Sequence, residues 1–118
     1  MDRLKSKITR YQIILSQLVE QLADDRNSVS GAILEYQSIT DKIHNHFQLT
    51  KVGWHNRKYH FQVLLHLDLR EDGQVWIQQN NTELLLDEIL IEKVVERSDI
   101  ILGFRPDWMR ELMQVEAA

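Results

Sequence analysis

Residues 59–69 alternate between apolar and mostly polar side chains, and no other stretch of the chain constrains the fold as strongly. A period of two over this length predicts a β-strand with one face in the core. Residues 75–78 read as a second strand, so the two form a predicted hairpin. The apolar side chains at the odd positions are predicted to form its buried face: Tyr59, Phe61, Val63, Leu65, Leu67 and Leu69.

The loop of this hairpin decides how the two strands pair. A two-residue loop at Asp72 and Gly73 would place Asp68 beside Ile77. A three-residue loop, residues 71–73, keeps apolar side chains together and needs a left-handed residue at its end, a role that Gly73 fills. The sequence therefore favours the longer loop. The pairs expected from it are Leu69 with Val75, Asp68 with Trp76, Leu67 with Ile77 and His66 with Gln78.

Residues 2–25 carry apolar side chains at spacings of three and four, which predicts an amphipathic helix with Asp2 as its N-cap. A coiled-coil seam and a helix lying across a sheet both fit this pattern. The second is favoured because the stripe spans only about three heptads and the strands that follow need a cover. The stripe consists of Leu4, Ile8, Tyr11, Leu15, Leu18 and Leu22, widened by Ile14 and Val19.

The remaining elements follow from shorter patterns. Strands are predicted over residues 32–40 and 46–54, with a turn over residues 53–58. Thr82 is a predicted N-cap for a helix over residues 83–95, whose core side chains are expected to be Leu85, Leu86, Ile89, Leu90 and Val94. Residues 100–104 form a strand or a tight helical turn, and Pro106 opens a last helix through residue 113. The predicted fold is one α+β domain over residues 1–118, with an N-terminal helix, a four-stranded antiparallel meander and two C-terminal helices.

Composition narrows the function classes. The 118 residues have a net charge of −4 and no cysteine, which is compatible with a cytoplasmic protein and excludes thiolate chemistry. No apolar run approaches the ~20 residues of a membrane span. Motifs of nucleophilic catalysis, phosphate binding and dinucleotide binding are absent from the sequence. The prediction is therefore a protein that is not an enzyme, with no catalytic site, cofactor or bound metal.

The face of the hairpin opposite the predicted core is the candidate functional surface. Apolar side chains lie there among polar ones, as at a protein contact. Three occupants stay open: a protein partner, a second copy of the chain, or the C-terminal segment with Phe104, Trp108 and Met109. The candidate interface consists of Trp54, His60, Gln62, Leu64, His66, Asp68, Trp76 and Gln78.

Two smaller groups carry alternative hypotheses. His46, His66 and Asp68 would converge as metal ligands if their strands are neighbours. The favoured explanation is that they are polar residues on the solvent-facing surface of a half-buried sheet, because no HExxH motif, cysteine ligand or run of carboxylates supports a metal site, and no metal is predicted. Arg57 and Lys58, next to Trp54 and Tyr59 in a turn, are candidate nucleic-acid contacts.

Several motifs together resemble the XisI family, the fdxN element excision controlling factors of cyanobacteria. The pieces are VGW at residues 52–54, HLD at 66–68, DGQVWIQ at 72–78, NNTE at 80–83 and DIILGF at 99–104. This chain departs from the family pattern at Asn81, where glycine is common. It also departs at residues 94–97, where a Gly-Val-Pro break is common, so the end of the second helix is open.

The resemblance implies a non-catalytic accessory role. Members of the family are linked to excision of a DNA element by a site-specific recombinase during heterocyst differentiation, together with a second accessory protein, XisH. The implied partners are therefore an XisH-like, nuclease-related protein or a recombinase, with a homodimer as a further option. Direct contact with recombination ends and antitoxin-like inhibition of a nuclease-like partner are the alternatives.

Overall fold

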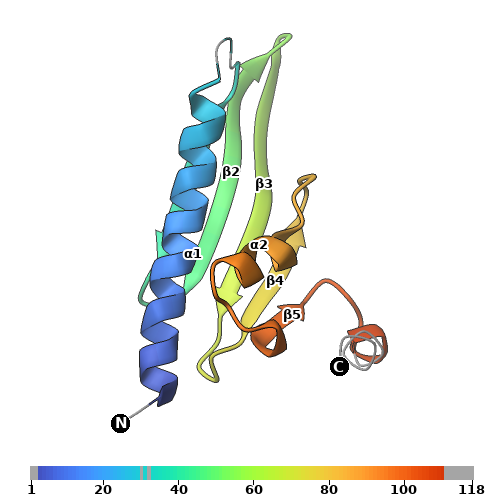
Figure 1. Cartoon of the computed structure of the whole chain (residues 1–118). Coiled ribbons are helices and arrows are strands. Elements are labelled where there is room, and N and C mark those ends of the chain that lie inside the picture. The colour runs from blue at the N-terminus through green and yellow to red at the C-terminus, as the bar shows by residue number, and fades with distance from the viewer. Residues whose placement is uncertain (1–2, 30, 32, 111–118) are drawn as a thin grey trace.

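The fold consists of one long helix laid along a five-stranded sheet, with small helical elements at one end (Figure 1). The computed structural model describes residues 3–29, 31 and 33–110. The strand order in the sheet follows the sequence. The elements are α1 (Arg3–Asn27), β1 (Glu35–Asp41), β2 (His46–His55), β3 (Lys58–Leu69), β4 (Val75–Asn80), α2 (Leu86–Glu92), the 3-10 turn η1 (Arg97–Asp99) and β5 (Ile100–Leu102).

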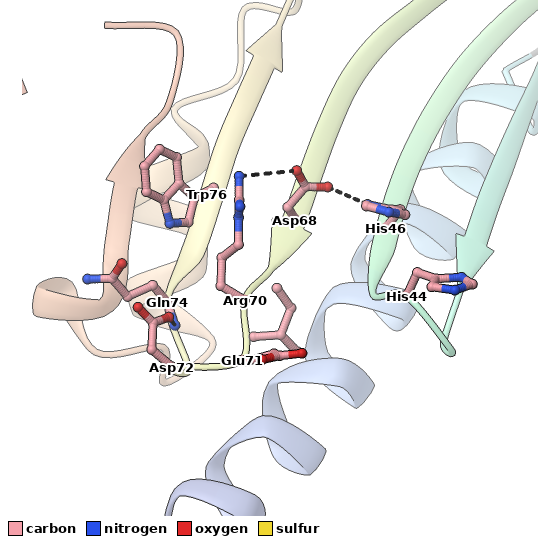
Figure 2. Close-up of a pocket in the computed structure, with 9 residues that line it drawn as sticks. His44, His46, Asp68, Arg70, Glu71, Asp72, Gln74 and Trp76 are labelled. Carbon is pink, nitrogen blue, oxygen red and sulfur yellow. Dashed lines mark hydrogen bonds and ion pairs between the residues drawn. The ribbon is translucent and has the colours of Figure 1, made fainter. Parts of the chain in front are cut away.

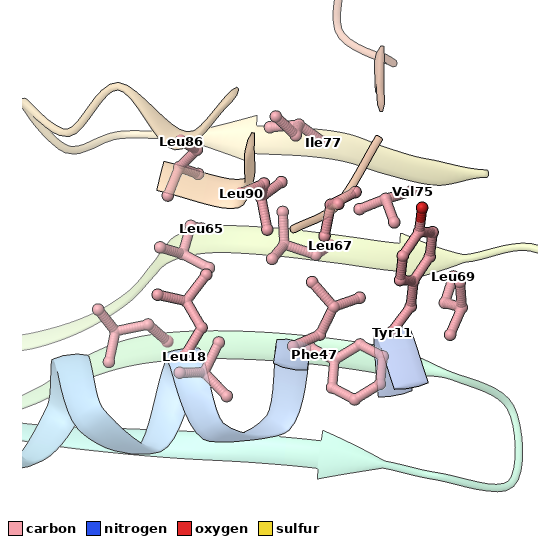
Figure 3. Packing of buried hydrophobic residues seen from close by; sticks show 14 of the residues in the cluster. Tyr11, Leu18, Phe47, Leu65, Leu67, Leu69, Val75, Ile77, Leu86 and Leu90 are labelled. Carbon is pink, nitrogen blue, oxygen red and sulfur yellow. The ribbon is translucent and has the colours of Figure 1, made fainter. Parts of the chain in front are cut away.

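Helix α1 covers the sheet, as its apolar stripe predicts. Tyr11, Leu15 and Leu18 are buried, and they pack with Phe47 and Leu67 from the strands in one core (Figure 3). The coiled-coil alternative is therefore wrong for this stripe. The helix runs two residues past its predicted end, and the predicted cap at Asp2 lies outside the described residues.

The loop between β3 and β4 has the predicted three-residue form. Gly73 has a φ of +85°, and its N–H donates to the carbonyl of Arg70 at 2.9 Å. Leu69 pairs with Val75, Asp68 with Trp76, and Leu67 with Ile77. The fourth predicted pair is wrong, because a β-bulge at Gln78 pairs His66 with Gln79 instead.

A second bulge, in β3, overturns half of the predicted buried face. Leu65 pairs with Leu49, but the next pair along is Val63 with Thr50, so Leu64 is an extra residue. Leu64 is buried in the core beside Leu65. The bulge shifts the alternation by one residue, and the odd positions before it turn away from α1. Tyr59 and Phe61, predicted as core, are 52% and 63% exposed.

The first two strands are shifted from their predicted bounds. Strand β1 starts at Glu35, and predicted position 32 lies outside the described residues. Strand β2 extends to His55, which shortens the turn before β3 to Asn56 and Arg57. Both turn residues have positive φ, 51° and 62°, as a two-residue hairpin turn of type I′ requires.

Helix α2 is shorter than predicted, and Thr82 does not cap it. The Thr82 hydroxyl donates to Oδ1 of Asn80 at 2.6 Å and accepts from the N–H of Leu84 at 3.1 Å. The Thr82 hydroxyl is thus used in local turns and does not cap a helix, and α2 starts at Leu86. Leu86 and Leu90 are buried and Ile89 is half-buried, as predicted. Leu85, predicted as core, precedes the helix and is 61% exposed.

The end of α2 corrects a further core prediction. Val94 has a φ of +72° and is 66% exposed, whereas Val95 is 1% exposed. The left-handed residue reverses the chain direction, so the next side chain enters the core in its place. A β-branched residue is strained in this conformation.

Replacing Val94 with glycine should therefore stabilise the protein by about 0.5–1 kcal/mol. Relief of left-handed strain outweighs the larger chain entropy of glycine, and little buried surface is lost. Urea denaturation measures the change. Val29→Gly is the matched control, because Val29 is equally accessible at 62% and has no positive φ. Equal effects of the two substitutions would contradict the prediction.

The last strand makes the sheet mixed. After β4 the chain crosses over through α2 and returns in the same direction, so β5 pairs with β4 in parallel, Trp76 opposite Ile101. The four-stranded antiparallel meander is therefore corrected to a meander plus one parallel edge strand. A last helix begins at residue 107, and its predicted end at residue 113 lies outside the described residues. Within the described parts of the chain, no helix is long and apolar enough to cross a membrane.

Candidate functional site

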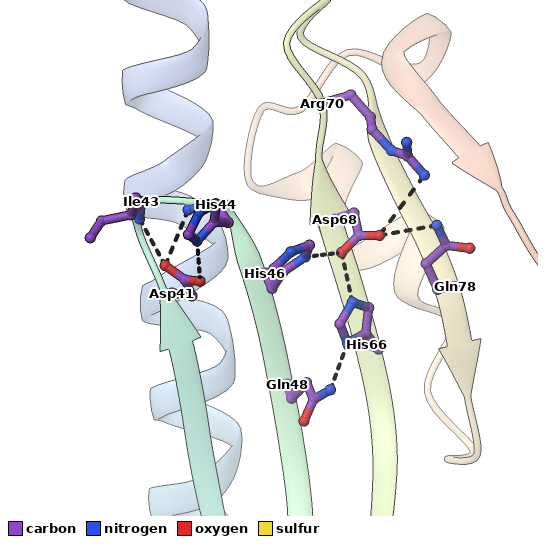
Figure 4. A network of polar contacts seen from close by, with 9 residues as sticks. All are labelled: Asp41, Ile43, His44, His46, Gln48, His66, Asp68, Arg70 and Gln78. Carbon is purple, nitrogen blue, oxygen red and sulfur yellow. Dashed lines mark hydrogen bonds and ion pairs between the residues drawn. The ribbon is translucent and has the colours of Figure 1, made fainter.

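A cluster of polar side chains lies on the sheet face that α1 leaves uncovered, centred on Asp68. His46 pairs directly with Asp68 across β2 and β3, and His66 is two residues earlier on the same face. Oδ1 of Asp68 accepts hydrogen bonds from Nδ1 of His46 and Nε2 of His66, each at 2.6 Å. Nε2 of Gln78 donates to Oδ2 of Asp68 at 3.1 Å (Figure 4). Three donors from three strands thus converge on one carboxylate.

These donors set the charge state of Asp68. Partial burial alone would raise the pKa of the carboxyl, but the hydrogen bonds from His46, Gln78 and His66 outweigh it and hold the pKa below its usual value. The side chain of Asp68 is 14% exposed, and the guanidinium of Arg70 lies 4.0 Å from Oδ2. Asp68 is therefore a shielded anion at neutral pH.

The cluster also defines the orientation of the His66 ring. Because an ionised carboxylate only accepts hydrogen bonds, Nε2 of His66 must carry the proton that points at Asp68. Its other nitrogen, Nδ1, lies 2.7 Å from the amide nitrogen of Gln48, which donates to it. Both ring nitrogens of a neutral imidazole are thus satisfied, and the ring is held in one orientation.

An open groove of about 710 Å³ runs beside the cluster (Figure 2). His44 lies at one side of the groove. Its ring is stacked with the ring of His46, with the two centroids 6.5 Å apart, and its Nδ1 lies at hydrogen-bond distance, 2.9 Å, from Oδ2 of Asp41. Two backbone N–H groups and the His44 ring hold the pKa of the exposed Asp41 carboxyl below its usual value. The residues that line the groove are His44, His46, Asp68, Leu69, Arg70, Glu71, Asp72, Gln74 and Trp76.

The structure brings together half of the predicted interface. His66, Asp68, Trp76 and Gln78 form one contiguous group on the uncovered face. Trp54 lies on that face near the far end of β2, because β2 alternates without a bulge from His46 onward. The role of these residues in partner binding stays a prediction.

The other three predicted interface residues lie elsewhere. Leu64 is buried in the core, 6% exposed. His60 and Gln62 pair with Gly53 and Lys51, which places them on the side of the sheet that faces α1. The β3 bulge causes both differences. One signal in the sequence pointed to it: Leu64 is the one apolar residue at an even position of the alternating run.

Trp76 is partly covered by the chain itself. The guanidinium groups of Arg70 and Arg110 lie 4.8 and 5.2 Å from its ring centroid. Gly103 packs so closely that an added Cβ would lie 3.1 Å from Cε3 of Trp76. The C-terminal segment therefore covers this end of the face, which was one of the three occupants left open. Phe104 and Trp108 remain 48% and 62% exposed.

The far end of the β2–β3 hairpin exposes an aromatic surface, for which the sequence indicated Trp54 and Tyr59 but missed Phe61, which was predicted as core. Trp54 pairs with Tyr59, with ring centroids 5.3 Å apart, and Val52 pairs with Phe61. We call these four residues the hairpin aromatic face. Trp54 is 67% exposed. Arg57, in the turn, and Lys58, the first residue of β3, are both exposed beside this face, so the predicted group of two cations and two aromatics is assembled.

The fold and sequence match one protein family. The family model described as XisI protein matches residues 1–116. The chain belongs to the XisI family. A crystal structure of a XisI-like protein from Anabaena variabilis is 33% identical and has a TM-score of 0.79, with 89% of this chain and 94% of that chain covered. The resemblance read from the sequence is confirmed.

A second solved structure has the same fold at lower identity. It is the fdxN element excision controlling factor XisI from Anabaena variabilis, with 24% identity, a TM-score of 0.73, and 88% of this chain and 98% of that chain covered. No curated protein matches the sequence.

Proposed function

We propose that this XisI family member is a non-catalytic accessory factor that controls excision of a DNA element by binding a protein, of which an XisH-like, nuclease-related protein is the foremost candidate. The excision role rests on family membership and on the name of the solved Anabaena relative. The observation that carries the binding mode is the exposed hairpin aromatic face.

The hairpin aromatic face has the composition of a binding surface. Trp54, Tyr59 and Phe61 are each more than half exposed, although they lie on regular strands where burial would stabilise the sheet. Tryptophan and tyrosine are enriched among the residues that dominate binding energy at protein interfaces. Strand positions also hold these rings in a fixed arrangement, so little side-chain entropy is lost on binding. A partner with a matching apolar patch would bury them.

The double variant Trp54→Ala/Phe61→Ala should weaken binding to an XisH-like protein from the same host by about 30-fold or more. That loss corresponds to roughly 2 kcal/mol, the level of an interface hot spot. Isothermal titration calorimetry with the purified partner measures this loss of affinity. Trp108→Ala is the matched control, because Trp108 is 62% exposed on the C-terminal segment.

Two results would contradict this proposal. One is equal partner affinity of the double variant and the wild type. The other is a dimer of the wild type that becomes monomeric in the double variant, measured by light scattering, because the face would then be occupied by a second copy.

A second candidate function is direct contact with nucleic acid at the hairpin tip. Exposed Arg57 and Lys58 next to the stacked rings of Trp54 and Tyr59 combine charge with a stacking surface, the pairing used for single strands. Binding would weaken steeply with added salt. Fluorescence anisotropy with single-stranded and recombination-end DNA tests it, and a flat titration at low salt excludes it.

A further inference from the structure

We propose that His46, His66 and Asp68 together bind one divalent transition-metal ion such as Zn²⁺. One potential ligand atom from each residue lies within 4.8 Å of the other two. Two imidazoles and one carboxylate are a common ligand set for zinc and related metals. This inference revises the expectation of no metal and does not depend on the proposed function.

The strand register assembles the three ligands before any ion arrives. His46 and Asp68 are a direct cross-strand pair, and His66 lies on the same face two residues along β3. The two imidazole centroids are 5.6 Å apart, on either side of the Asp68 carboxylate. An ion near Oδ1 of Asp68 would take the place of the two imidazole protons that point there now, while both nitrogens stay as ligands, so only small side-chain movements are needed.

Side chains next to the cluster hydrogen-bond the proposed ligands, as the neighbours of metal ligands commonly do. Gln48 bonds the remaining nitrogen of His66 at 2.7 Å, and Gln78 bonds the other oxygen of Asp68 at 3.1 Å. Outer-shell partners of this kind hold the ring and carboxylate orientations of metal ligands. The side chain of His66 is 21% exposed and that of Asp68 is 14% exposed, so both are shielded from bulk water.

Proton balance is simple if both imidazoles are neutral. Each ring moves its proton from the nitrogen that binds the ion to the other nitrogen, and no proton is released. For His46, half exposed, water accepts the new N–H. For His66, the new Nδ1–H meets Gln48, whose amide must turn to present its oxygen. A rotated Gln48 side chain is therefore a structural consequence of ion binding.

The three ligands leave coordination positions open. His46 and Asp68 also line the groove beside the cluster, so water or a small anionic group can reach the ion. An open position distinguishes this arrangement from the closed four-ligand sites that stabilise small folds. We therefore expect the protein to fold without the ion.

The test uses residues 1–118 treated with a chelator to remove bound metal. One titration adds Co²⁺ and monitors visible absorption, and a second adds Zn²⁺ and monitors heat by calorimetry. We expect one ion per chain. His46→Gln and His66→Gln should each weaken binding by about 100-fold or more, above the usual effect of losing an outer-shell partner. His55→Gln and His60→Gln are the matched controls, because these histidines lie on the other face with ring centroids 6.4 Å apart.

A second measurement needs no variant. In NMR spectra of the imidazole nitrogens of the wild type, adding Zn²⁺ should shift the resonances of His46 and His66 and leave those of His55 and His60 unchanged. The proposal is overturned if no Co²⁺ absorption develops, if His46→Gln and His66→Gln bind as tightly as wild type, or if the control variants lose the ion instead.

Discussion

Replacing Phe47 with alanine should lower the free energy of unfolding by about 3–5 kcal/mol, the usual range for removing a fully buried phenylalanine ring. Phe47 is 0% exposed. Its ring lies between α1 and the sheet, and its strand partner is Leu67 (Figure 3). The substitution both returns apolar surface to water and leaves a cavity where the helix meets the sheet. Urea denaturation followed by circular dichroism measures the change.

Phe61→Ala is the matched control for this prediction. Phe61 is 63% exposed on β3, beyond the bulge. Its removal should change the free energy of unfolding by no more than about 0.5 kcal/mol, as for most surface substitutions. A large loss from Phe61→Ala would mean that the odd-numbered side of β3 is buried along its whole length. That outcome would contradict the bulge at Leu64.

Replacing Tyr11 with phenylalanine should lower the free energy of unfolding by about 1–3 kcal/mol, the penalty for unpaired buried polar groups. The Tyr11 hydroxyl donates to Oδ2 of Asp99 at 2.6 Å and accepts from the N–H of Glu96 at 3.1 Å. It thereby ties α1 to the turn η1. Lys7 also lies 3.1 Å from Asp99, so the carboxylate keeps one partner in the variant. Leu15→Met, a volume-conserving change one turn along the helix, is the control and should cost less than about 1.5 kcal/mol.

The same hydroxyl predicts a dependence on alkaline pH. Burial raises the pKa of Tyr11, and the hydrogen bond to Asp99 raises it further. In the unfolded chain the pKa is near the usual 10.0. At a pH between the pKa of the unfolded state and that of the folded state, Tyr11 keeps its proton in the folded protein and has lost it in the unfolded chain. The free energy of unfolding therefore falls as pH rises, by at most about 1.4 kcal/mol per pH unit from this group. The contribution is fully present below pH ~10.

Tyr11→Phe should therefore remove this part of the alkaline dependence. The stability difference between wild type and variant should shrink as pH rises above about 10. Parallel urea titrations from neutral pH to pH ~11 check it. A difference that stays constant over this range would show that the Tyr11 hydroxyl keeps its usual pKa in the folded protein.

Much of the fold could be predicted because local sequence and tertiary structure agree. The stripe on α1 has the helical period, and its apolar face is buried against the sheet. The loop after β3 was predictable because Gly73 tolerates the left-handed conformation found there. The family was recognisable from short motifs in order and spacing, and the match over residues 1–116 confirms it.

The candidate site was predictable only in part, because bulges decide which side chains share a face. Leu64 shifts the alternation of β3 by one residue, which moves His60 and Gln62 away from Asp68 and exposes Phe61. The alternation of one strand does not show where it has an extra residue relative to the partner strand. The pairing of His46 with Asp68 likewise depends on the registers of two separate strands.

The sequence of residues 59–78 by itself determined that a hairpin forms, where it turns and which residues pair next to the turn. Those features depend on neighbours in the chain, on the period of the side chains and on one glycine. Tertiary structure decided which side chains are buried beyond Leu65, that β5 joins in parallel, and that three ligand atoms meet at Asp68. These features depend on contacts between segments distant in sequence, whose geometry no local pattern encodes.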